Sequence, residues 1–591
     1  MHGRVVVTLG EQLSSAIEQH KSGDLKGAEA AYQAILEREP ASCDARHLLG
    51  VVAHQQGDHH RATELIQEAL QLNPDAPAFH CNLGVALKAK GKLEQAVGSY
   101  RRALQLAPEY AEAHCNLGSA LRRQGKIDES EASLRQALRI RPRYADALSS
   151  LGATLRRQGK TLEAIAACET AVELKPRSAE ALINLGNALR DDGKPEEAIE
   201  VLRGAARLSS NNASVFSNLG NAHQDLGSLA EACECYDRAI ELKPDYVEAL
   251  TNLGAALRLR GDLFSAAKFA RQALEIDPEF AEAHWNLALF LLSSADFDAG
   301  WAEYEWRWKL GNSSSRQFDK PLWEGQILDG QTLLVHAEQG FGDTIQFVRY
   351  LRQVKDLCGR VVFEAPPPLV TLLQGVPGIG VIVAAGQPLP NFDAHCPLLS
   401  LPRIFKTSLE TVPRDVPYLQ ADAILSAQWN QRLGPCEGRR VGLCWQGSPT
   451  FAGDRLRSIP LHHYQALADV PNVSFVSLQK EHGLDQLRGG AFPGNVLDIS
   501  AELKDFSTTA AVISNLNLVI SSDTSVAHLA GALGVPVWLA LQYAPDWRWL
   551  TVREDSPWYP TLRLFRQSTL QDWPDVFERI ATALKIGLPL T

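Results

Sequence analysis

The first half of the chain takes its fold from a short stretch that reads Asn82-Leu83-Gly84-Val85-Ala86-Leu87-Lys88-Ala89-Lys90-Gly91. Both glycines of this stretch return every 34 residues, at 50, 84, 118, 152, 186, 220 and 254 and at 57, 91, 125, 159, 193, 227 and 261. A glycine inside a helix costs about 1 kcal/mol relative to alanine, so the return of Gly84 predicts a helix contact too close for a side chain. Gly91 is predicted to end that helix.

A small residue marks the predicted contact on the second helix of each unit. It is alanine at 28, 62, 96, 164, 198, 232 and 266 and serine at 130. With its closing proline, as at Pro74, the unit resembles the tetratricopeptide repeat. The resemblance implies eight repeats within residues 8–290, capped by a helix that holds Asn286-Leu287-Ala288. The concave groove of such an array would bind peptides or partner domains, and a plain spacer or a dimerisation arm is the alternative.

Composition narrows the classes of function. The chain has 591 residues and a net charge of -11, which argues against sequence-independent binding of nucleic acid. Its ten cysteines show no metal-ligand spacing, so we interpret them as reduced thiols of a cytoplasmic protein rather than as metal or redox sites. No uncharged apolar run reaches 18 residues and the N-terminus lacks a signal-peptide core, so no transmembrane segment is expected.

Residues 291–330 form an aromatic-rich connector that is predicted to be helical at its start. Trp301, Tyr304, Trp306 and Trp308 place four large rings within eight residues. We expect these rings to join the repeat array to the next domain, and a platform for stacking sugars is the alternative.

From residue 331 onward, short apolar runs alternate with helical stretches, which is typical of parallel sheets buried on both faces. The predicted fold class is therefore a multidomain chain with an all-α superhelix followed by an α/β double Rossmann-like domain. We expect a short first lobe over 331–423 and a second lobe over 437–591, which face each other across a cleft. The expected strands are 333–337, 361–365, 381–385, 441–445, 473–478, 518–522 and 536–541.

The first strand of the α/β region is followed by Gly340-Phe341-Gly342-Asp343. Two glycines at a strand-to-helix turn let the backbone approach a ligand, and the ligands of open α/β sheets lie at the carboxyl ends of strands. Asp343 then lies in the first helical turn. Its alternative role is that of a simple helix cap.

A second strand ends in Asp523-Thr524-Ser525, and a helix rich in small residues follows at once. Free amide N–H groups and the helix dipole would make this end a seat for a diphosphate. His528 is one turn into the helix, where it faces the cleft or, alternatively, is a satisfied core histidine.

Two further strand ends carry candidate binding residues. Gln446 follows one strand, and the loop after it brings Arg457, which we expect to point inward and clamp a phosphate, whereas Arg455 is the solvated arginine. Gln479 and Lys480 follow the next strand and are candidates for contacts with a ribose or base.

Together, the motifs 338–343, 454–460, 523–536, 546–549 and 556–560 resemble a bacterial tetratricopeptide protein with a glycosyltransferase family 9 domain, the family of the heptosyltransferases. The domain order is also similar to that of O-linked N-acetylglucosamine transferases. The family differs from this chain in usually having lysine at the position of Arg457.

The resemblance implies a GT-B fold, a nucleotide-diphosphate sugar held mainly by the second lobe, and inverting transfer without a bound metal or other cofactor. In it, Asp343 is the general base, Thr524 and Ser525 hold the diphosphate, Arg457 stabilises its charge, and Asp523 contacts the sugar.

The leading hypothesis is a cytoplasmic glycosyltransferase whose repeats capture a protein or glycan acceptor. The alternative is a catalytically inactive scaffold for protein interaction. A dinucleotide-dependent oxidoreductase is a third interpretation, but the complete glycine fingerprint that it requires is missing.

Overall fold

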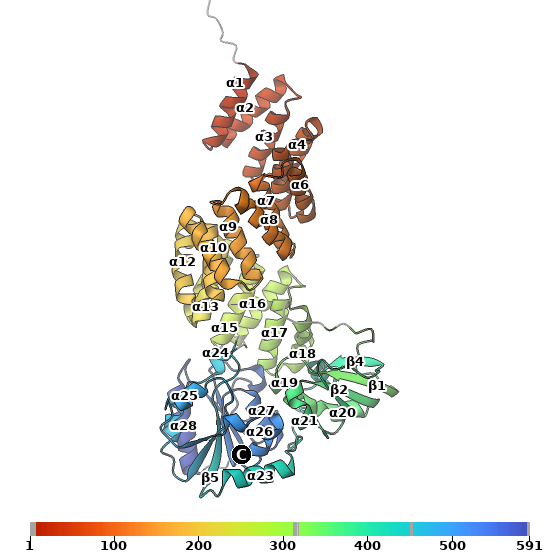
Figure 1. The fold of residues 1–591 in the computed structure, drawn as a ribbon, viewed down its shortest axis with the longest axis vertical. Helices are drawn as coiled ribbons and strands as arrows, with labels where there is room; N and C mark the ends of the chain where they lie inside the picture. Colours follow the sequence, from red (N-terminus) through yellow and green to blue (C-terminus); the bar gives the residue numbers. More distant parts are fainter. Residues whose placement is uncertain (1–7, 311–315, 317, 450–452, 588–591) are drawn as a thin grey trace, which may run out of the picture. The chain divides into compact units, whose positions relative to one another are not determined.

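The computed structural model describes residues 8–310, 316, 318–449 and 453–587. It divides into two compact units, Met1–Pro244 and Asp245–Thr591, which are considered separately below (Figure 1). Within the described residues, no helix is both long enough and apolar enough to cross a membrane.

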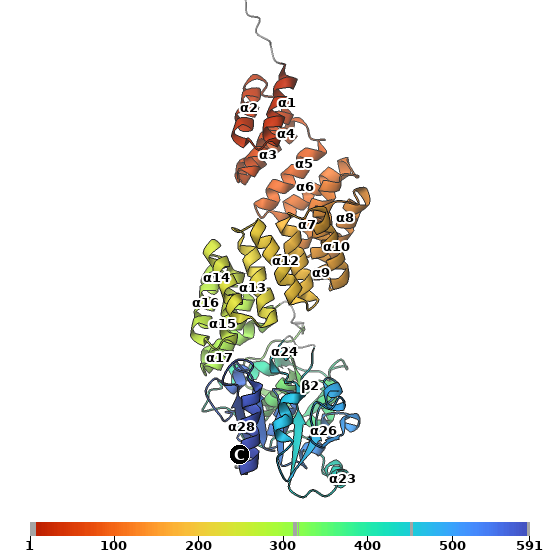
Figure 2. The same ribbon diagram turned by 90° about the vertical axis from the view of Figure 1, so that its left-hand side faces the viewer.

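The first unit is a succession of helical hairpins, which follow one another along the chain in Figure 2. Each turn glycine, such as Gly57 with a φ of 91° and Gly91 with a φ of 76°, has the left-handed backbone that ends the first helix of its pair. The helices are α1 (Leu9–Lys21), α2 (Leu25–Arg38), α3 (Cys43–Gln55), α4 (His59–Leu72), α5 (Pro77–Ala89), α6 (Leu93–Leu106), α7 (Ala111–Arg123), α8 (Ile127–Ile140), α9 (Ala145–Arg157), α10 (Thr161–Leu174), α11 (Ala179–Asp191), α12 (Pro195–Leu208), α13 (Ala213–Leu226) and α14 (Leu229–Leu242).

The helical glycines lie where the sequence predicts the closest helix contact. A Cβ atom on Gly84 would lie 2.5 Å from Cε1 of Tyr100, and one on Gly118 would lie 2.5 Å from Cγ of Leu134. Such distances are far below van der Waals contact, so an alanine requires the second helix to move. The prediction of a contact that excludes any side chain is confirmed.

The second unit begins with α15 (Val247–Leu259) and α16 (Leu263–Ile276), which form the eighth hairpin of the sequence, and α17 (Ala281–Ser293), which takes the place of the expected capping helix. The aromatic connector follows as α18 (Phe297–Tyr304) and η1 (Glu305–Lys309).

The connector is part of the hydrophobic core of the second unit. Trp301 is 2% exposed and its Nε1–H donates to the carbonyl of Thr407 at 3.0 Å, while Trp306 stacks on His284 of α17 with ring centroids 3.6 Å apart. Trp323 is fully buried and its backbone N–H donates to the carbonyl of His395 at 2.8 Å. These contacts favour the role of the rings in joining the repeat array to the next domain over the role of a platform for stacking sugars.

The first sheet is parallel with the order β3-β2-β1-β4. It is formed by β1 (Leu328–His336), β2 (Cys358–Ala365), β3 (Val381–Ala384) and β4 (Ala394–Pro397). Sequence reasoning missed β4, because a four-residue strand that contains His and Pro carries no apolar run. The helices between and after these strands are α19 (Phe341–Phe347), η2 (Val348–Tyr350), α20 (Leu351–Lys355), η3 (Pro367–Leu369), α21 (Val370–Leu373), η4 (Leu398–Ser400) and α22 (Leu401–Ile404).

The second sheet is also parallel, with the order β10-β9-β8-β5-β6-β7. Counted within this sheet, the order is 3-2-1-4-5-6, that of Rossmann folds, and the first sheet has its 3-2-1-4 part. Its strands are β5 (Arg439–Cys444), β6 (Val473–Ser477), β7 (Val496–Asp498), β8 (Leu518–Ser521), β9 (Val537–Leu541) and β10 (Leu562–Arg566). The edge strands β7 and β10 were not predicted, because β7 has only three residues and β10 alternates with arginine.

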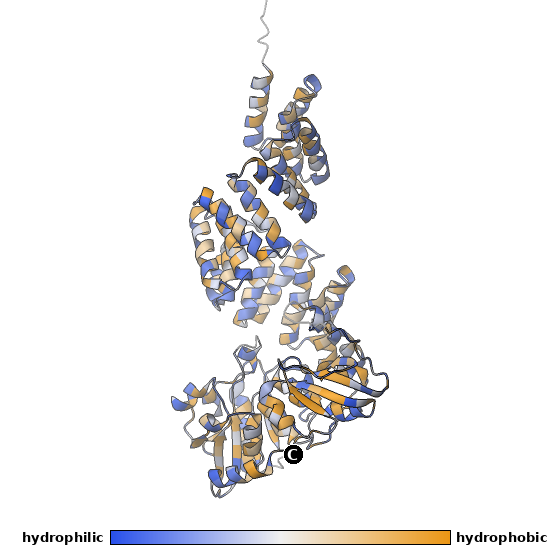
Figure 3. Cartoon of the chain, turned by 45° about the vertical axis from the view of Figure 1, so that its right-hand side comes forward, coloured by the Kyte–Doolittle hydropathy of each residue, from blue (hydrophilic) through white to orange (hydrophobic). Residues whose placement is uncertain are grey.

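The helices of the second sheet are α23 (Ala423–Leu433), α24 (Asp454–Arg457), η5 (Leu461–Leu467), α25 (Leu484–Arg488), η6 (Ser500–Glu502), α26 (Phe506–Ile513), α27 (Ser525–Ala532), η7 (Trp547–Trp549) and α28 (Trp573–Ile586). In Figure 3 the strands of the sheets are mostly hydrophobic, as sheets covered on both faces require.

The division of the α/β region differs from the prediction in two places. The stretch expected to be a break between lobes holds α23, which contacts α26, and Asn515 donates to the carbonyl of Ser426 at 2.9 Å. The first lobe is also not confined to 331–423, because Trp301 and Trp323 of the connector supply part of its core.

The close contact of Gly84 makes a prediction about stability. Gly84→Ala is expected to destabilise the protein by about 1–3 kcal/mol, because overpacking outweighs the gain in helix propensity. Thermal unfolding followed by circular dichroism measures the change. The matched control is Gly98→Ala in α6, where an added Cβ meets nothing within 4 Å, and it is expected to stabilise by up to about 1 kcal/mol. Stabilisation by both variants would contradict the packing role.

Candidate functional site

The candidate site lies in the second unit, where the helices that follow β1 and β8 meet. These helices, α19 and α27, contact each other, and a Cβ on Gly342 would lie 2.9 Å from Cδ2 of His528. The N–H of Gly340 donates to Oδ2 of Asp343 at 2.8 Å. The two glycines were predicted to approach a ligand, but the structure uses Gly342 for helix packing and Gly340 to bind the Asp343 carboxylate.

Arg548 is the residue that organises the site, and sequence reasoning did not select it. Its buried guanidinium bonds to the carboxylate of Asp343, donates from Nε to Oε1 of Gln346 at 2.7 Å, and donates from Nη1 to Oδ1 of Asp546 at 2.8 Å. It also lies over the ring of Trp547, 4.3 Å from the centroid. Arg548 therefore links the segment after β9 to the helix after β1.

Opposing influences set the protonation of Asp343. Burial raises the pKa of its carboxyl, and the positive charge of Arg548 and the N–H of Gly340 act in the other direction. Each carboxylate oxygen accepts one of these bonds, which leaves lone pairs available for a proton. Asp343 is thus more than a simple helix cap, because it is also the partner of a buried cation.

The N-terminus of α27 lies beside Asp523. Thr524 is the N-cap residue, but its side chain does not cap the helix. Its hydroxyl lies 3.2 Å from Oγ of Ser521 and 3.6 Å from Sγ of Cys444, so Thr524 supports the loop from within rather than offering its hydroxyl to a diphosphate. The helix end and the half-buried Ser525 remain the features of this loop that suit an anion.

His528 has the environment of a core histidine. It is 5% exposed, it stacks on Trp549 with centroids 5.4 Å apart, and its Nδ1 lies 3.0 Å from the hydroxyl of Tyr559. Burial lowers its pKa, and the charges of Arg548 and Arg349 lower it further, so the ring is neutral. These contacts favour the alternative of a satisfied histidine.

Arg457 is close enough to the site for its charge to act on the carboxylates there. Its positive charge contributes to lowering the pKa of both Asp343 and Asp523, and its Nε donates to Oδ1 of Asp454 at 3.1 Å. Arg457 is half-buried, whereas Arg455 is exposed. Of the two arginines of this loop, Arg457 is therefore the one placed to meet an anion at the site.

Gln479 differs from its predicted role in binding a ribose or base. Its Oε1 accepts from the N–H groups of Trp445 and Gln446, both at 3.0 Å, and its Nε2 donates to the carbonyls of Gln446 and His482 at 2.8 and 2.9 Å. These bonds use the full capacity of a side-chain amide. Gln479 is therefore a positioning residue for the turn after β5.

The two remaining predicted binding residues lie at the margin of this turn. The side chain of Gln446 accepts from Nε2 of Gln486 at 3.2 Å. Lys480 is exposed and donates to the carbonyl of Lys504 at 3.2 Å. Neither side chain bonds to Asp343, Asp523 or Arg548 among the contacts of the described residues.

The ionised form of Asp523 is unfavourable in the folded protein, so its ionisation at neutral pH lowers the stability of the fold. Its Oδ2 accepts from Nε1 of Trp549 at 2.9 Å, but burial, followed by the negative charge of Asp546, raises its pKa to about 6. The same Asp546 acts on Arg258 of α15, whose pKa is lowered by burial and raised again by that carboxylate. A carboxylate that is costly to ionise at neutral pH is typical of functional sites.

Asp523→Asn is expected to stabilise the protein in a pH-dependent way. The pKa of Asp523 in the folded protein exceeds the ordinary value of 3.8. Protonated Asp523 therefore contributes fully to the free energy of unfolding below pH 3.8, and this contribution is lost as the pH rises through about 6. The variant should therefore gain on the order of 2 kcal/mol at pH 7.5 and little at about pH 3.5, below the ordinary value. Thermal unfolding at both pH values measures this, and a gain that does not depend on pH would contradict the assignment.

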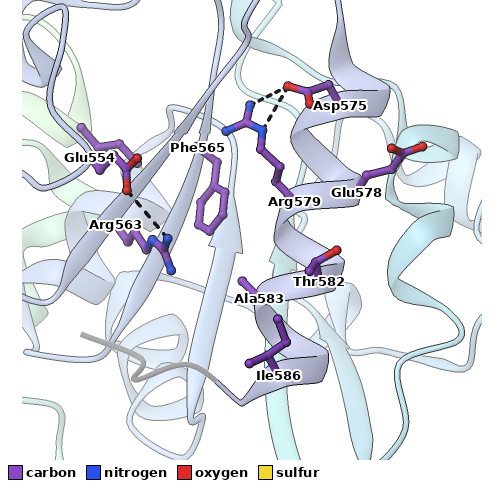
Figure 4. A pocket seen from close by; sticks show the side chains of 10 residues that line it. Glu554, Arg563, Phe565, Asp575, Glu578, Arg579, Thr582, Ala583 and Ile586 are labelled. Carbon is purple, nitrogen blue, oxygen red and sulfur yellow. Dashed lines mark hydrogen bonds and ion pairs between the residues drawn. The ribbon is translucent and has the colours of Figure 1, made fainter.

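A depression between β10 and α28 lies away from this site (Figure 4). Its charged side chains neutralise each other, since Arg563 pairs with Glu554 at 3.8 Å and Arg579 pairs with Asp575 at 2.8 Å. None of the predicted site residues lines it. Among the residues described by the structure, no group of three His, Cys, Asp or Glu side chains is placed to hold a metal ion.

Two protein-family models match the first half of the chain. Residues 8–249 match the family model of the cilia and flagella-associated protein 70 C-terminal domain, and residues 235–268 match that of the tetratricopeptide repeat. The first half of the chain consists of tetratricopeptide repeats. The matches do not extend to the two parallel sheets.

Individual similar proteins each match about half of this chain or less. Protein FlbA of Caulobacter vibrioides is 28% identical over 328 residues, which are 50% of this chain and 54% of FlbA. The chain therefore spans about half the length of this curated relative. Among solved structures, the Cut9-Hcn1 tetramer of APC/C is 17% identical with a TM-score of 0.41, over 48% of this chain and 55% of that chain. A tetratricopeptide repeat protein of Parabacteroides merdae is 17% identical with a TM-score of 0.36, over 42% of this chain and 98% of that one.

Proposed function

We propose that the α/β region is a glycosyltransferase that uses a nucleotide-diphosphate sugar, and that the tetratricopeptide repeats bind its acceptor. The observation that carries the proposal is the contact of α19 with α27, which brings Asp343 and the uncapped start of α27 together, within electrostatic reach of Arg457, in a unit with two sheets of Rossmann-like strand order. Tetratricopeptide repeats are scaffolds for protein interaction, which favours a protein acceptor over a free glycan. A GT-B arrangement is the finer form of this proposal.

In the proposed reaction, Asp343 accepts the proton of the acceptor hydroxyl. The acceptor oxygen forms a bond to the anomeric carbon of the sugar, and the bond from that carbon to the diphosphate oxygen breaks. The nucleoside diphosphate leaves with the electron pair. Inversion at the anomeric carbon follows from this single displacement.

Arg548 and Arg457 have different roles in this reaction. Arg548 favours the ionised form of Asp343, because its charge opposes the desolvation that raises the carboxyl pKa. Arg457 and the start of α27 stabilise the negative charge that grows on the diphosphate, as preorganised donors do at reacting centres.

A second candidate function is an inactive scaffold, and the same ion pair favours it. Asp343 bound to Arg548 and Gly342 packed on His528 are also what a purely structural contact between two helices would show. The two functions differ in whether the α/β region binds a nucleotide, so binding separates them.

A thermal-shift screen of the full chain against nucleoside diphosphates and nucleotide sugars tests the proposal. At least one of them is expected to raise the melting temperature. Arg457→Gln should then weaken that binding at least about tenfold, because it removes a charged hydrogen-bond donor. The matched control is Arg455→Gln in the same loop, which is expected to leave binding unchanged. No shift with any nucleotide would favour the scaffold.

Asp343→Asn tests the chemistry once a donor is identified. It should keep donor binding and lower the transfer rate by a factor of about 10²–10⁴, the usual contribution of a general base. The rate of sugar transfer to a protein acceptor, measured beside calorimetric donor binding, gives the two effects separately. Unchanged turnover would remove Asp343 from the mechanism.

A further inference from the structure

One register of the first unit carries an unusual set of cations. Three residues before the turn glycine, successive first helices have Lys88, Arg122, Arg156 and Arg190, and the next position adds Arg123 and Arg157. These residues lie in the last turns of α5, α7, α9 and α11 or just before them. Because α5 contacts α7 and α7 contacts α9, the register forms a continuous line of positive charge.

Part of this line is neutralised within the unit. Nε of Arg156 lies 2.8 Å from Oδ2 of Asp191, and Nε of Arg190 lies 2.7 Å from Oδ2 of Asp225. Lys88, Arg122, Arg123 and Arg157 form no such ion pair with any residue that the structure describes; Arg157 donates instead to the carbonyl of Arg122 at 3.4 Å. We call these four residues the basic row.

The basic row is crowded and partly removed from water. The pKa of Lys88 is lowered, first by burial and also by the charges of Arg123 and Arg122, and the pKa of Arg122 is lowered by burial and by Arg157. Nε of Arg122 is buried and has no hydrogen-bond partner among the described residues. This donor is therefore available to a ligand that reaches the row.

The row lies on the inner side of the hairpin succession, because the first helices α5, α7, α9 and α11 contact one another in turn, whereas the second helices α6, α8 and α10 make no comparable contacts with one another. Glu180, at the start of α11 and three hairpins beyond Lys88, still acts electrostatically on both Lys88 and Arg122. Glu180 is thus the carboxylate of this inner side that acts on the row.

The outer, second helices show the opposite arrangement. Arg101 of α6 pairs with Glu129 at 2.8 Å, and Arg135 of α8 pairs with Glu131 at 2.8 Å. In a chain of net charge -11, a row of cations without ion pairs to any described residue along successive first helices therefore differs from these paired arginines of α6 and α8.

We propose that the basic row is the docking surface for an acidic protein segment in extended conformation. Side-chain carboxylates would form charge-assisted hydrogen bonds with the four cations, one of which has a desolvated donor ready to bond. Nucleic acid fits less well, because phosphates recur at every nucleotide and would meet Glu180 and Asp191 at this surface, whereas the spaced carboxylates of a protein segment can lie opposite the cations alone. The proposal concerns the first unit alone and holds whether or not the second unit transfers a sugar.

Fluorescence anisotropy of the full chain with a labelled peptide of sequence (Glu-Gly-Ser)4 tests the proposal. The wild type is expected to bind this peptide at low salt, to bind it more weakly as salt is added, and to ignore the corresponding (Lys-Gly-Ser)4 peptide. The combined variant Lys88→Gln, Arg122→Gln, Arg123→Gln and Arg157→Gln should bind at least about tenfold more weakly.

The matched control removes four arginines from the outer helices, as Arg101→Gln, Arg102→Gln, Arg135→Gln and Arg139→Gln. It changes the net charge by the same amount and should keep the affinity of the wild type. Because Lys88 and Arg122 are half-buried, the exposed single variant Arg123→Glu serves as a second test and should also weaken binding. Thermal unfolding of each variant checks that the hairpins remain folded.

Three results would overturn the proposal. They are the absence of (Glu-Gly-Ser)4 binding at low salt, an equal loss of affinity in the outer-helix control, and tighter binding of a twelve-nucleotide uridine RNA than of the acidic peptide. None of these readouts depends on sugar transfer, so the proposal and the glycosyltransferase function fail independently.

Discussion

The second unit depends on one buried cation, the guanidinium of Arg548. It bonds to Asp343 and Gln346 of α19 on one side and to Asp546 on its own side. Breaking a buried ion pair costs about 3–5 kcal/mol, since the remaining charge has no partner and little water. Without Arg548, Asp343 and Asp546 would be partly buried carboxylates without this cation, and the charge of Asp546 already raises the pKa of Asp523. The site therefore exists only while the two helical segments are held together by this side chain.

The sequence predicted the parts of the fold that repeat or that lie at the centre of a sheet. The period of Gly84 and Gly91 located the hairpins, because steric limits at a close contact and at a left-handed turn admit glycine alone. The central strands were found from their apolar runs. The edge strand β7 and the short strand β4 were missed, because hydrogen bonding to a neighbour defines them and their side chains carry no pattern.

The candidate site was predicted in part for a similar reason. Asp343 and Asp523 could be selected because each follows a buried strand, and the ends of parallel strands lie at one edge of a sheet. Arg548 is 205 residues from Asp343, and no spacing rule connects them. The signal available was Asp546-Trp547-Arg548-Trp549, in which two charged residues alternate with two large rings that favour burial. Gln479 shows the opposite limit, since an amide suits a ligand and a backbone turn equally well.

The two units use charge in different ways. In the second unit, the cations of the site are paired with carboxylates. Burial and the charge of Asp546 raise the pKa of Asp523, and a carboxyl group of this kind suits chemistry on a charged substrate. In the first unit, the basic row keeps four cations without carboxylate partners among the described residues, which suits recognition of an acidic segment. The enzyme that we propose, with repeats that select an acidic protein and sheets that bind a nucleotide sugar, would account for both arrangements.

The most direct test of this account is hydrogen–deuterium exchange over residues 341–350 in the variant Arg548→Gln. If the guanidinium holds α19 in place, exchange there should increase at least about tenfold, while α5 and α7 remain as protected as in the wild type. Adding Asp343→Asn to the variant should change little, because the ion pair is already lost. The matched control Arg553→Gln, which removes the exposed pair with Asp555, should leave the segment protected. Unchanged protection of residues 341–350 in Arg548→Gln would contradict the central role of this cation.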